Sequence, residues 1–191
     1  MHSFRLFQIA VLTWVSLGAA GHAAAEVGQT ASASHKTRHK AAKTTSAPVS
    51  IGKFGDWQAA THVDAGELSC YAFSRPQSSE PALVGRDNDA VVFTVTERTK
   101  LRDTVALSAG FAYAANAEVT VAVGSQKFPF YTSGRSAFAR DGGAVIAAFD
   151  RGDSAAVVSP GPKGKDVTDH FRLTGFSAAF KAVLAACPDK S

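Results

Sequence analysis

The hydrophobic pattern of the chain changes its period near the C-terminus. Up to Leu173 apolar and polar residues alternate as in a β-strand, whereas after Gly175 apolar residues recur at the spacing of one helix face. The residues on this face are Phe176, Phe180, Val183, Leu184 and Cys187. We expect the Thr174 hydroxyl to cap the helix and Pro188 to end it. The pattern predicts a C-terminal helix that packs on a sheet, with Phe180 at the centre of its buried stripe.

The chain before this helix is typical of short strands separated by tight turns. Residues 90–96 alternate most clearly. Residues 118–123 and 126–131 flank Gly124-Ser125, which has the length of a two-residue hairpin loop. In the second of these strands, Pro129 suggests an edge strand or a bulge. Further strands are predicted at residues 67–73, 104–113, 155–158 and 167–173.

Closely spaced strands with hairpin turns predict the fold class. We expect a mainly β protein, an antiparallel β-sandwich or open barrel with the C-terminal α-helix packed on it. Residues 76–86, rich in Ser, Pro and Gly, are expected to form a loop, and Trp57 to be buried against the sheet. The period of residues 144–149 fits either a helix or a strand, and both alternatives stay open.

The first 25 residues have the pattern of a secretory signal peptide. Residues 8–20 are almost wholly apolar, a run too short to span a bilayer core of about 30 Å. Ala23-Ala24-Ala25 supplies the small residues of a cleavage site, so we expect cleavage after Ala25. These features predict a periplasmic or secreted protein with no transmembrane segment in its mature form. Association with the outer membrane is a further option.

Residues 26–50 form a basic linker of Ala, Ser, Thr and Lys. With few large apolar side chains, the linker cannot bury enough surface to offset the entropy of ordering, so we expect it to be disordered. Its four cations, against the single carboxylate of Glu26, are Lys36, Arg38, Lys40 and Lys43. Such cations can contact an anionic lipid or polysaccharide surface. The alternative is that the linker is only a solubilising spacer.

Residues 51–191 have the size of one domain with a single core. From Ile51 onward, 15 Lys and Arg balance 15 Asp and Glu, so this part gives no reason to expect a nucleic-acid partner. The chain has two cysteines, and an even number in an exported protein favours a disulfide between Cys70 and Cys187. Both cysteines lie on apolar faces of elements that we expect to pack together.

Several short motifs occur in a fixed order between residues 52 and 188. They are Phe54-Gly-Asp-Trp57, Cys70-Tyr71, Ser74-Arg-Pro76, Val92-Phe-Thr-Val-Thr96, Phe128-Pro-Phe-Tyr131 and the closing segment 169–180 with Cys187. Together they resemble the invasion associated locus B family of bacterial exported proteins. The resemblance implies a small periplasmic or envelope-associated β domain at residues 51–191, with no known enzymatic activity. The sequence departs from that family's pattern in residues 159–165 and lacks the additional cysteine pair of some members.

The motif Gly175-Phe-Ser177-Ala-Ala179 has the setting of a nucleophile elbow, because it follows a strand and opens a helix. A hydrolase would also need an Asp and a His beside Ser177, and only His62 and His170 lie in the domain. A serine that caps the backbone at a helix start explains the motif more simply. We therefore expect no catalytic residue. A periplasmic serine hydrolase that uses Ser177 with a histidine is kept as the alternative.

Three further patterns are weak signals of function. His62 and His170 have no cluster of Cys, Asp or Glu at ligand spacing around them, so we expect neither a metal site nor a cofactor. Lys163 and Lys165 lie in a Gly-Pro loop without the residue order of a phosphate-binding loop. Arg151-Gly152-Asp153 matches a short adhesive motif, but a turn after a helix explains its glycine equally well.

These patterns favour a non-enzymatic exported protein of the cell envelope that works as an interaction module. Its expected partner is an anionic envelope surface or an envelope protein, and its oligomeric state stays open. Besides the hydrolase, the second alternative is a small-ligand binder that uses the sandwich interior or one end.

Overall fold

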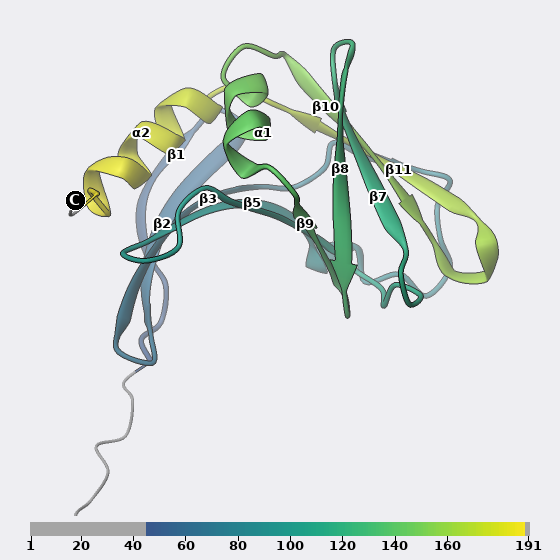
Figure 1. Ribbon diagram of the computed structural model, residues 1–191, viewed down its shortest axis with the longest axis horizontal. Helices are drawn as coiled ribbons and strands as arrows, with labels where there is room; N and C mark the ends of the chain where they lie inside the picture. The colour runs from purple at the N-terminus through teal and green to yellow at the C-terminus, as the bar shows by residue number, and fades with distance from the viewer. Residues whose placement is uncertain (1–44, 190–191) are drawn as a thin grey trace, which may run out of the picture. The chain divides into compact units, whose positions relative to one another are not determined.

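The computed structural model describes residues 45–189, which belong to the compact unit Ala41–Ser191. In this part of the chain, eleven strands form one antiparallel sheet in the order β1-β2-β3-β5-β6-β9-β8-β7-β10-β11-β4 (Figure 1). The sheet does not close, and the C-terminal helix α2 packs on β1, β2 and β3. The expected class, a mainly β antiparallel fold with a C-terminal helix packed on it, is confirmed.

The described elements follow the chain with few helices among the strands. The first strands are β1 (Val49–Phe54), β2 (Trp57–Asp64), β3 (Glu67–Ser74), β4 (Ser78–Glu80), β5 (Val91–Arg98) and β6 (Thr104–Ala109). The later strands are β7 (Glu118–Val123), β8 (Gln126–Ser133), β9 (Ser136–Ala139), β10 (Ser154–Pro160) and β11 (Asp166–Arg172). The helices are α1 (Gly142–Phe149) and α2 (Phe176–Ala186), with short 3-10 turns at Asn88–Ala90 and Pro162–Gly164.

The strand pattern forms largely as its alternation predicts. In β5 the inward side chains of Val91, Phe93 and Val95 are buried, and β7 and β8 form the expected hairpin around Gly124. The interpretation of Pro129 as a sign of an edge strand is wrong, because β8 lies inside the sheet between β9 and β7. A proline is accommodated there because the ladder between β8 and β9 begins only one residue later.

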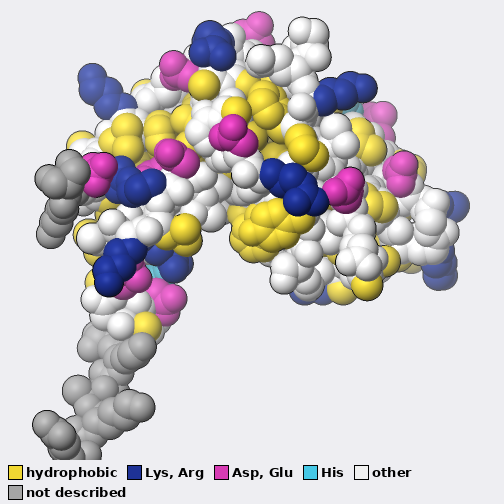
Figure 2. Space-filling view, viewed as in Figure 1, with side chains coloured by type: hydrophobic (Ala, Val, Ile, Leu, Met, Phe, Trp, Pro, Cys, Tyr) yellow, Lys and Arg dark blue, Asp and Glu magenta, His cyan; other side chains and the backbone are white. Residues whose placement is uncertain are grey.

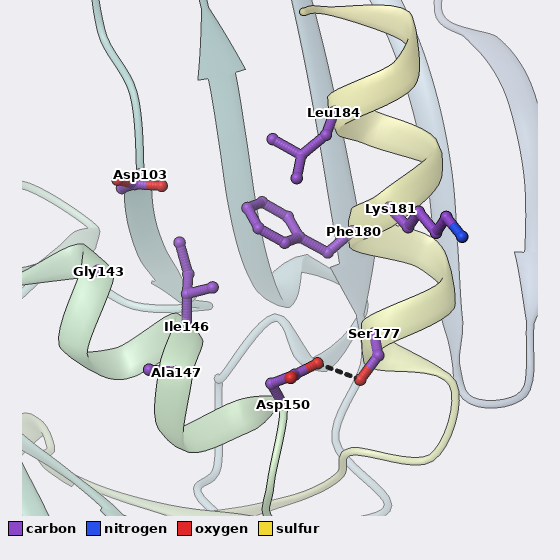
Figure 3. A pocket seen from close by; sticks show the side chains of 9 residues that line it. All are labelled: Asp103, Gly143, Ile146, Ala147, Asp150, Ser177, Phe180, Lys181 and Leu184. Carbon is purple, nitrogen blue, oxygen red and sulfur yellow. Dashed lines mark hydrogen bonds between the residues drawn. The ribbon is translucent and has the colours of Figure 1, made fainter. Parts of the chain in front are cut away.

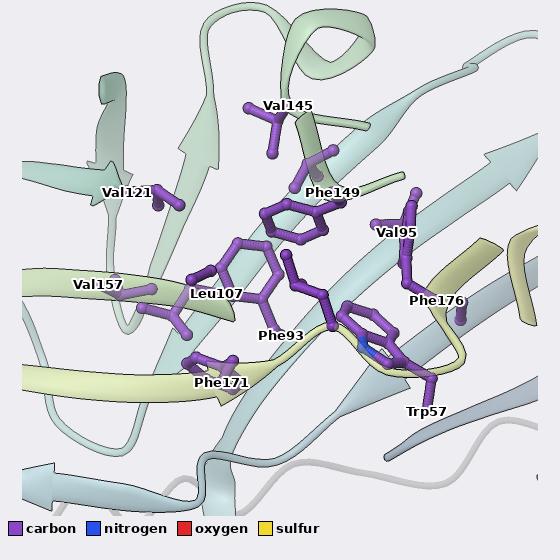
Figure 4. Close-up of a cluster of buried hydrophobic side chains, with 14 of the residues drawn as sticks. Trp57, Phe93, Val95, Leu107, Val121, Val145, Phe149, Val157, Phe171 and Phe176 are labelled. Carbon is purple, nitrogen blue, oxygen red and sulfur yellow. The ribbon is translucent and has the colours of Figure 1, made fainter. Parts of the chain in front are cut away.

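The core lies between the two halves of the curled sheet. Phe93 on β5 contacts Phe171 on β11 at a centroid distance of 5.3 Å, although five strands separate β5 from β11 in the sheet order. Trp57, Phe149 and Phe176 extend this aromatic cluster beneath the two helices (Figure 4). The burial of Trp57 is therefore confirmed. Its indole Nε1 donates to the carbonyl of Arg172 at 3.0 Å, which satisfies the one polar atom of that side chain.

Helix α2 begins differently from the expectation. Its N-cap is Gly175, whose backbone is left-handed with φ of 88°, and no side chain caps the helix, so the prediction that Thr174 caps it is wrong. A Cβ at Gly175 would overlap the carbonyl of Phe54, and only glycine allows this close approach. The residues of α2 that face the core are Phe176, Ala179 and Val183. Phe180, expected at the centre of the buried stripe, is only half-buried.

Two open questions of the sequence are answered by the fold. The segment at 144–149 is a helix, because the Asp141 side chain accepts from the backbone N–H of Ala144 at 2.9 Å and caps α1. The Cys70–Cys187 disulfide is confirmed and joins β3 to the end of α2, with the two Cα atoms 5.9 Å apart.

The first described strand begins slightly before the expected boundary at Ile51. Strand β1 starts at Val49, and the N–H of Ser46 donates to the carbonyl of Val63 at 2.9 Å. The signal segment and the linker cations Lys36, Arg38, Lys40 and Lys43 lie outside the described residues. Within residues 45–189, neither helix has the length and apolarity needed to span a bilayer.

Candidate functional site

The two helices enclose an open groove of about 470 Å³ (Figure 3). Its size falls in the range of about 300–1,000 Å³ that is usual for binding pockets. Figure 2 shows hydrophobic side chains exposed over this part of the domain, with acidic side chains between them. The residues that line the groove are Asp103, Gly143, Ile146, Ala147, Asp150, Ser177, Phe180, Lys181 and Leu184.

The floor of the groove is apolar because the sheet covers only part of the hydrophobic stripe of α2. Phe176, Ala179 and Val183 face the core and are buried. Phe180 lies one turn along, stacked on Phe176 with a centroid distance of 5.7 Å, and turns its other face toward Ile146 of α1 (Figure 3). Leu184 is 38 % exposed. The groove therefore presents apolar surface that the fold itself does not bury.

The position of α1 depends on a close backbone approach at its first residue. A Cβ at Gly142 would overlap the carbonyl oxygen of Asp103, so the loop that precedes β6 can lie against α1 only where a glycine stands. This approach places the Asp103 side chain on one wall of the groove. At the far end of α1, the N–H of Gly152 donates to the carbonyl of Ala148 at 3.0 Å and ends the helix.

The polar rim of the groove pairs Ser177 with a carboxylate rather than with a histidine. The Ser177 hydroxyl donates to the Asp150 carboxylate, a bond drawn in Figure 3. The interpretation of Ser177 as a backbone cap is therefore wrong, since the hydroxyl bridges the two helices instead. Among the described residues, no histidine lines the groove, and neither His62 nor His170 hydrogen-bonds Ser177. Figure 3 also shows the Lys181 side chain extending away from the groove, so the carboxylates face it.

A buried polar cluster holds the wall behind Asp103. Glu97 is fully buried, and its Oε1 accepts from the Asp103 N–H at 3.0 Å. Its Oε2 lies 2.6 Å from Arg102 Nε in an ion pair without a well-aligned hydrogen bond. Arg102 Nη1 in turn donates to the carbonyl of Cys187 at 2.8 Å. The cluster thus ties the loop before β6 to the end of α2.

Burial is the main reason why the pKa of Glu97 is raised above its ordinary value of 4.5. The hydrogen bond from the Asp103 backbone and the charge of Arg102 oppose this rise without cancelling it. The cluster was not predicted from the sequence. The signal that could have found it is a glutamate at an inward position of β5, followed by an arginine five residues later.

A second buried ion pair lies near the opposite edge of the sheet. Arg86 Nη1 and Nη2 donate to the two carboxylate oxygens of Asp169, each at 2.7 Å, and both side chains are almost fully buried. Ser79 Oγ also donates to Asp169 Oδ1 at 2.6 Å. Residues 76–86 are therefore more ordered than the expected loop, because they contain the short strand β4 and this buried arginine.

In the described part of the chain, the two histidines and the Arg151-Gly152-Asp153 motif do not line the groove. His62 lies on β2 and His170 is exposed on β11, and among residues 45–189 no three His, Cys, Asp or Glu side chains are grouped to hold a metal ion. In Arg151-Gly152-Asp153, Gly152 packs against Val123 in the turn after α1. The adhesive motif therefore has a structural explanation in this turn.

Comparisons with known proteins agree with the fold. A family model described as "Invasion associated locus B (IalB) protein" matches residues 57–184, which is more than half of the chain. The chain belongs to the invasion associated locus B family. The resemblance noted in the sequence motifs is thereby confirmed.

A solved structure shares the architecture. The crystal structure of invasion associated protein B from Bartonella henselae matches with a TM-score of 0.51 and 18 % sequence identity. The match covers 72 % of this chain and 96 % of the Bartonella chain. At this identity the likeness shows the fold alone. A comparison with curated proteins finds no match.

Proposed function

We propose that this invasion associated locus B protein is a non-enzymatic, exported module of the bacterial cell envelope that binds a partner protein in the groove between α1 and α2. The observation that carries the proposal is the open, apolar floor made by Ile146, Phe180 and Leu184. Interaction sites on proteins concentrate apolar side chains in a pocket surrounded by polar groups, and this groove has that composition.

The charge of the rim indicates which kind of partner fits. Asp103 and Asp150 place carboxylates along the groove, whereas the Lys181 side chain extends away from it (Figure 3). A partner segment with one large apolar side chain and a neighbouring Lys or Arg would cover the floor and pair with this rim.

Two features support export. The apolar run at 8–20 followed by Ala23-Ala24-Ala25 is typical of a cleaved secretory signal. The Cys70–Cys187 disulfide is of the kind that persists in an oxidising compartment such as the periplasm. The expected location is therefore the periplasm or the exterior of the cell.

The groove can be tested by site-specific photocrosslinking in intact cells. A photoreactive phenylalanine analogue at Leu184 should give one defined adduct with an envelope protein. The same analogue at Val158 on β10, which is also 38 % exposed, should give none. Added unlabelled protein should compete for the adduct, and the Leu184→Asp variant should fail to compete although its thermal midpoint is unchanged. Equal adducts at the two positions would contradict a site in the groove.

The hydrolase alternative has its own test. An activated-serine probe such as a fluorophosphonate should leave Ser177 unlabelled, since the groove offers its hydroxyl a carboxylate but no histidine. Labelling of the protein that is lost in Ser177→Ala would overturn the non-enzymatic proposal.

The basic linker is proposed as a contact with an anionic envelope surface. Deleting residues 26–44 removes Lys36, Arg38, Lys40 and Lys43 but keeps Ser46 bonded to Val63, so the thermal midpoint should not change. The deletion should weaken sedimentation with anionic vesicles, and raised salt should have the same effect on the unaltered protein. Replacing the four cations with glutamine separates charge from length. If both variants sediment like the mature chain, the linker is only a spacer.

A further inference from the structure

Two loops far apart in sequence meet at the end of the sheet where β10 turns into β11. Leu83 Cδ1 lies 3.1 Å from the position that a Cβ on Gly161 would take, so the first loop packs directly on the second. Together they line a shallow pocket of about 230 Å³. Its lining residues, which we call the loop tip, are Ala82, Leu83, Val84, Pro162, Lys163 and Lys165.

The loop tip combines a fully exposed apolar side chain with cations. Val84 has a relative exposure of 107 %, the highest among the exposed large hydrophobic residues of the described chain. Lys163 and Lys165 are exposed, and neither takes part in an ion pair among residues 45–189. The tip contains no carboxylate, although Asp166 follows it at the start of β11. Figure 2 shows cationic and hydrophobic side chains together at this end of the domain.

We propose that the loop tip inserts into the surface of a bilayer that contains anionic lipids. An apolar side chain surrounded by Lys is the arrangement that binds such an interface, because the apolar group enters the acyl boundary while the cations pair with lipid phosphates. A polysaccharide would be served by the two cations alone and would leave Val84 exposed to water. The full exposure of Val84 therefore favours lipid over a purely electrostatic surface.

The loop tip stands on a rigid base. The N–H of Arg86 donates to the carbonyl of Leu83 at 3.2 Å, and the Arg86 guanidinium is held by both carboxylate oxygens of Asp169 on β11. Strand β4 pairs with β11 just before the first loop. The buried ion pair thus fixes the loop that carries Leu83 and Val84 to the strand that follows Lys163 and Lys165. A tip already ordered loses little entropy on binding.

The proposal does not depend on partner binding in the groove. The seven residues of β11 separate the loop tip from the start of α2, a distance of about 20 Å at the usual rise of a strand. Insertion of the tip would therefore leave the groove between α1 and α2 in water. Membrane contact and partner binding are then compatible and can fail separately.

The test uses the mature chain with Lys36, Arg38, Lys40 and Lys43 replaced by glutamine, so that the linker does not mask the tip. Binding is measured by flotation with vesicles of phosphatidylcholine that contain phosphatidylglycerol, and with vesicles of phosphatidylcholine alone. We expect binding to the first kind only. Val84→Asp should weaken binding to these vesicles about tenfold, which corresponds to the free energy of burying one valine side chain. Lys163→Gln and Lys165→Gln should each weaken it about fivefold.

The matched control is Val49→Asp, which makes the same change at a valine on β1 that is 63 % exposed. It should bind vesicles like its parent. A tryptophan at position 84 gives a second readout, since its emission should shift to the blue on binding and be quenched by brominated lipid. Unchanged binding of Val84→Asp would overturn the proposal. So would a loss confined to the lysine variants, which would mean adsorption without insertion. An unshifted tryptophan spectrum would exclude insertion directly, whatever the crosslinking at Leu184 shows.

Discussion

The two ends of β11, a helical end beside α1 and α2 and a loop end beside residues 82–86, are stabilised differently. At its C-terminal end, Trp57, Phe149 and Phe176 pack edge to face beneath α1 and α2. At its N-terminal half, the charged pair Arg86–Asp169 and the hydroxyl of Ser79 are buried beside a small apolar cluster around Val167. Non-directional apolar contacts hold the helical end. The loop end has only a small apolar cluster, and it adds a few charged bonds whose geometry must be met together.

This difference explains which surface each end offers. Apolar packing at the helical end leaves part of the α2 stripe uncovered, and this surplus, Phe180 and Leu184, becomes the floor of the groove. At the loop end, the buried ion pair fixes a short loop whose Val84 side chain is fully exposed. Each proposed contact surface is therefore a direct result of how the structure beneath it is held.

The largest expected effect is loss of the disulfide at the helical end. The bridge closes a loop with a sequence separation of 117 residues, for which the chain-entropy estimate is about 4–5 kcal/mol. The double variant Cys70→Ala/Cys187→Ala should lose roughly that free energy of unfolding in a denaturant titration. Reducing agent should cause a similar loss in the unaltered protein and none in the variant. A variant as stable as the unaltered protein would show that packing alone holds this end.

At the loop end, removing one charge of the Arg86–Asp169 pair should destabilise the protein more than removing both charges. Asp169→Leu leaves the buried Arg86 without its partner and should cost about 3–5 kcal/mol of stability. Arg86→Leu combined with Asp169→Leu removes both charges and should recover much of this loss. The free energies of unfolding of the single and double variants measure the coupling. If the double variant loses the sum of the two single losses, the ion pair is not what organises the loop end.

The elements at the helical end could be predicted from the sequence because their apolar residues recur at the spacing of a strand or of a helix. The alternation of β5, the β7–β8 hairpin and the helical spacing after Gly175 are local patterns, and each forms as expected. The disulfide followed from two cysteines on apolar faces. The apolar stripe of α2 is wider than the part of the helix that the sheet covers. The sequence pattern therefore could not show that Phe180 lies at the edge of the covered part. The small Ala179 occupies the centre in its place.

The structure of the loop end could not be predicted from the sequence, because no local sequence pattern indicates it. Arg86 and Asp169 are 83 residues apart, and β4 has three polar residues whose pairing is set only by the neighbouring β11. The groove could not be predicted for a similar reason, since it depends on how α1 and α2 are placed by the contact between Gly142 and Asp103. The helical state of 144–149 could have been recognised from Asp141, a good N-cap residue at the right distance.

Substitutions at two positions of the α2 stripe distinguish a residue of the core from a residue of the groove. Phe176→Ala removes a fully buried ring and should cost about 3–5 kcal/mol of stability. Phe180→Ala removes a half-buried ring and should cost about 1–2 kcal/mol, since part of its surface is already in water. Thermal or denaturant unfolding measures both. The Phe180 variant should also lose the photocrosslink at Leu184, whereas equal destabilisation by the two variants would place Phe180 in the core.

The smallest expected effect concerns the pH dependence of the buried Glu97 behind the groove. Burial raises its pKa, so the folded state binds the proton more tightly than the unfolded state. The stabilisation that protonated Glu97 provides is therefore complete below the ordinary pKa of 4.5 and is lost as the pH rises through the higher pKa of the folded state. Glu97→Gln mimics the protonated form at every pH. The thermal midpoint of the unaltered protein should thus fall relative to that of Glu97→Gln as the pH rises from 4 to 7. Glu118→Gln, at a carboxylate that is 65 % exposed, is the control and should show no such change. Parallel midpoint curves for the unaltered protein and Glu97→Gln would mean that Arg102 and the Asp103 amide compensate the burial of Glu97 fully.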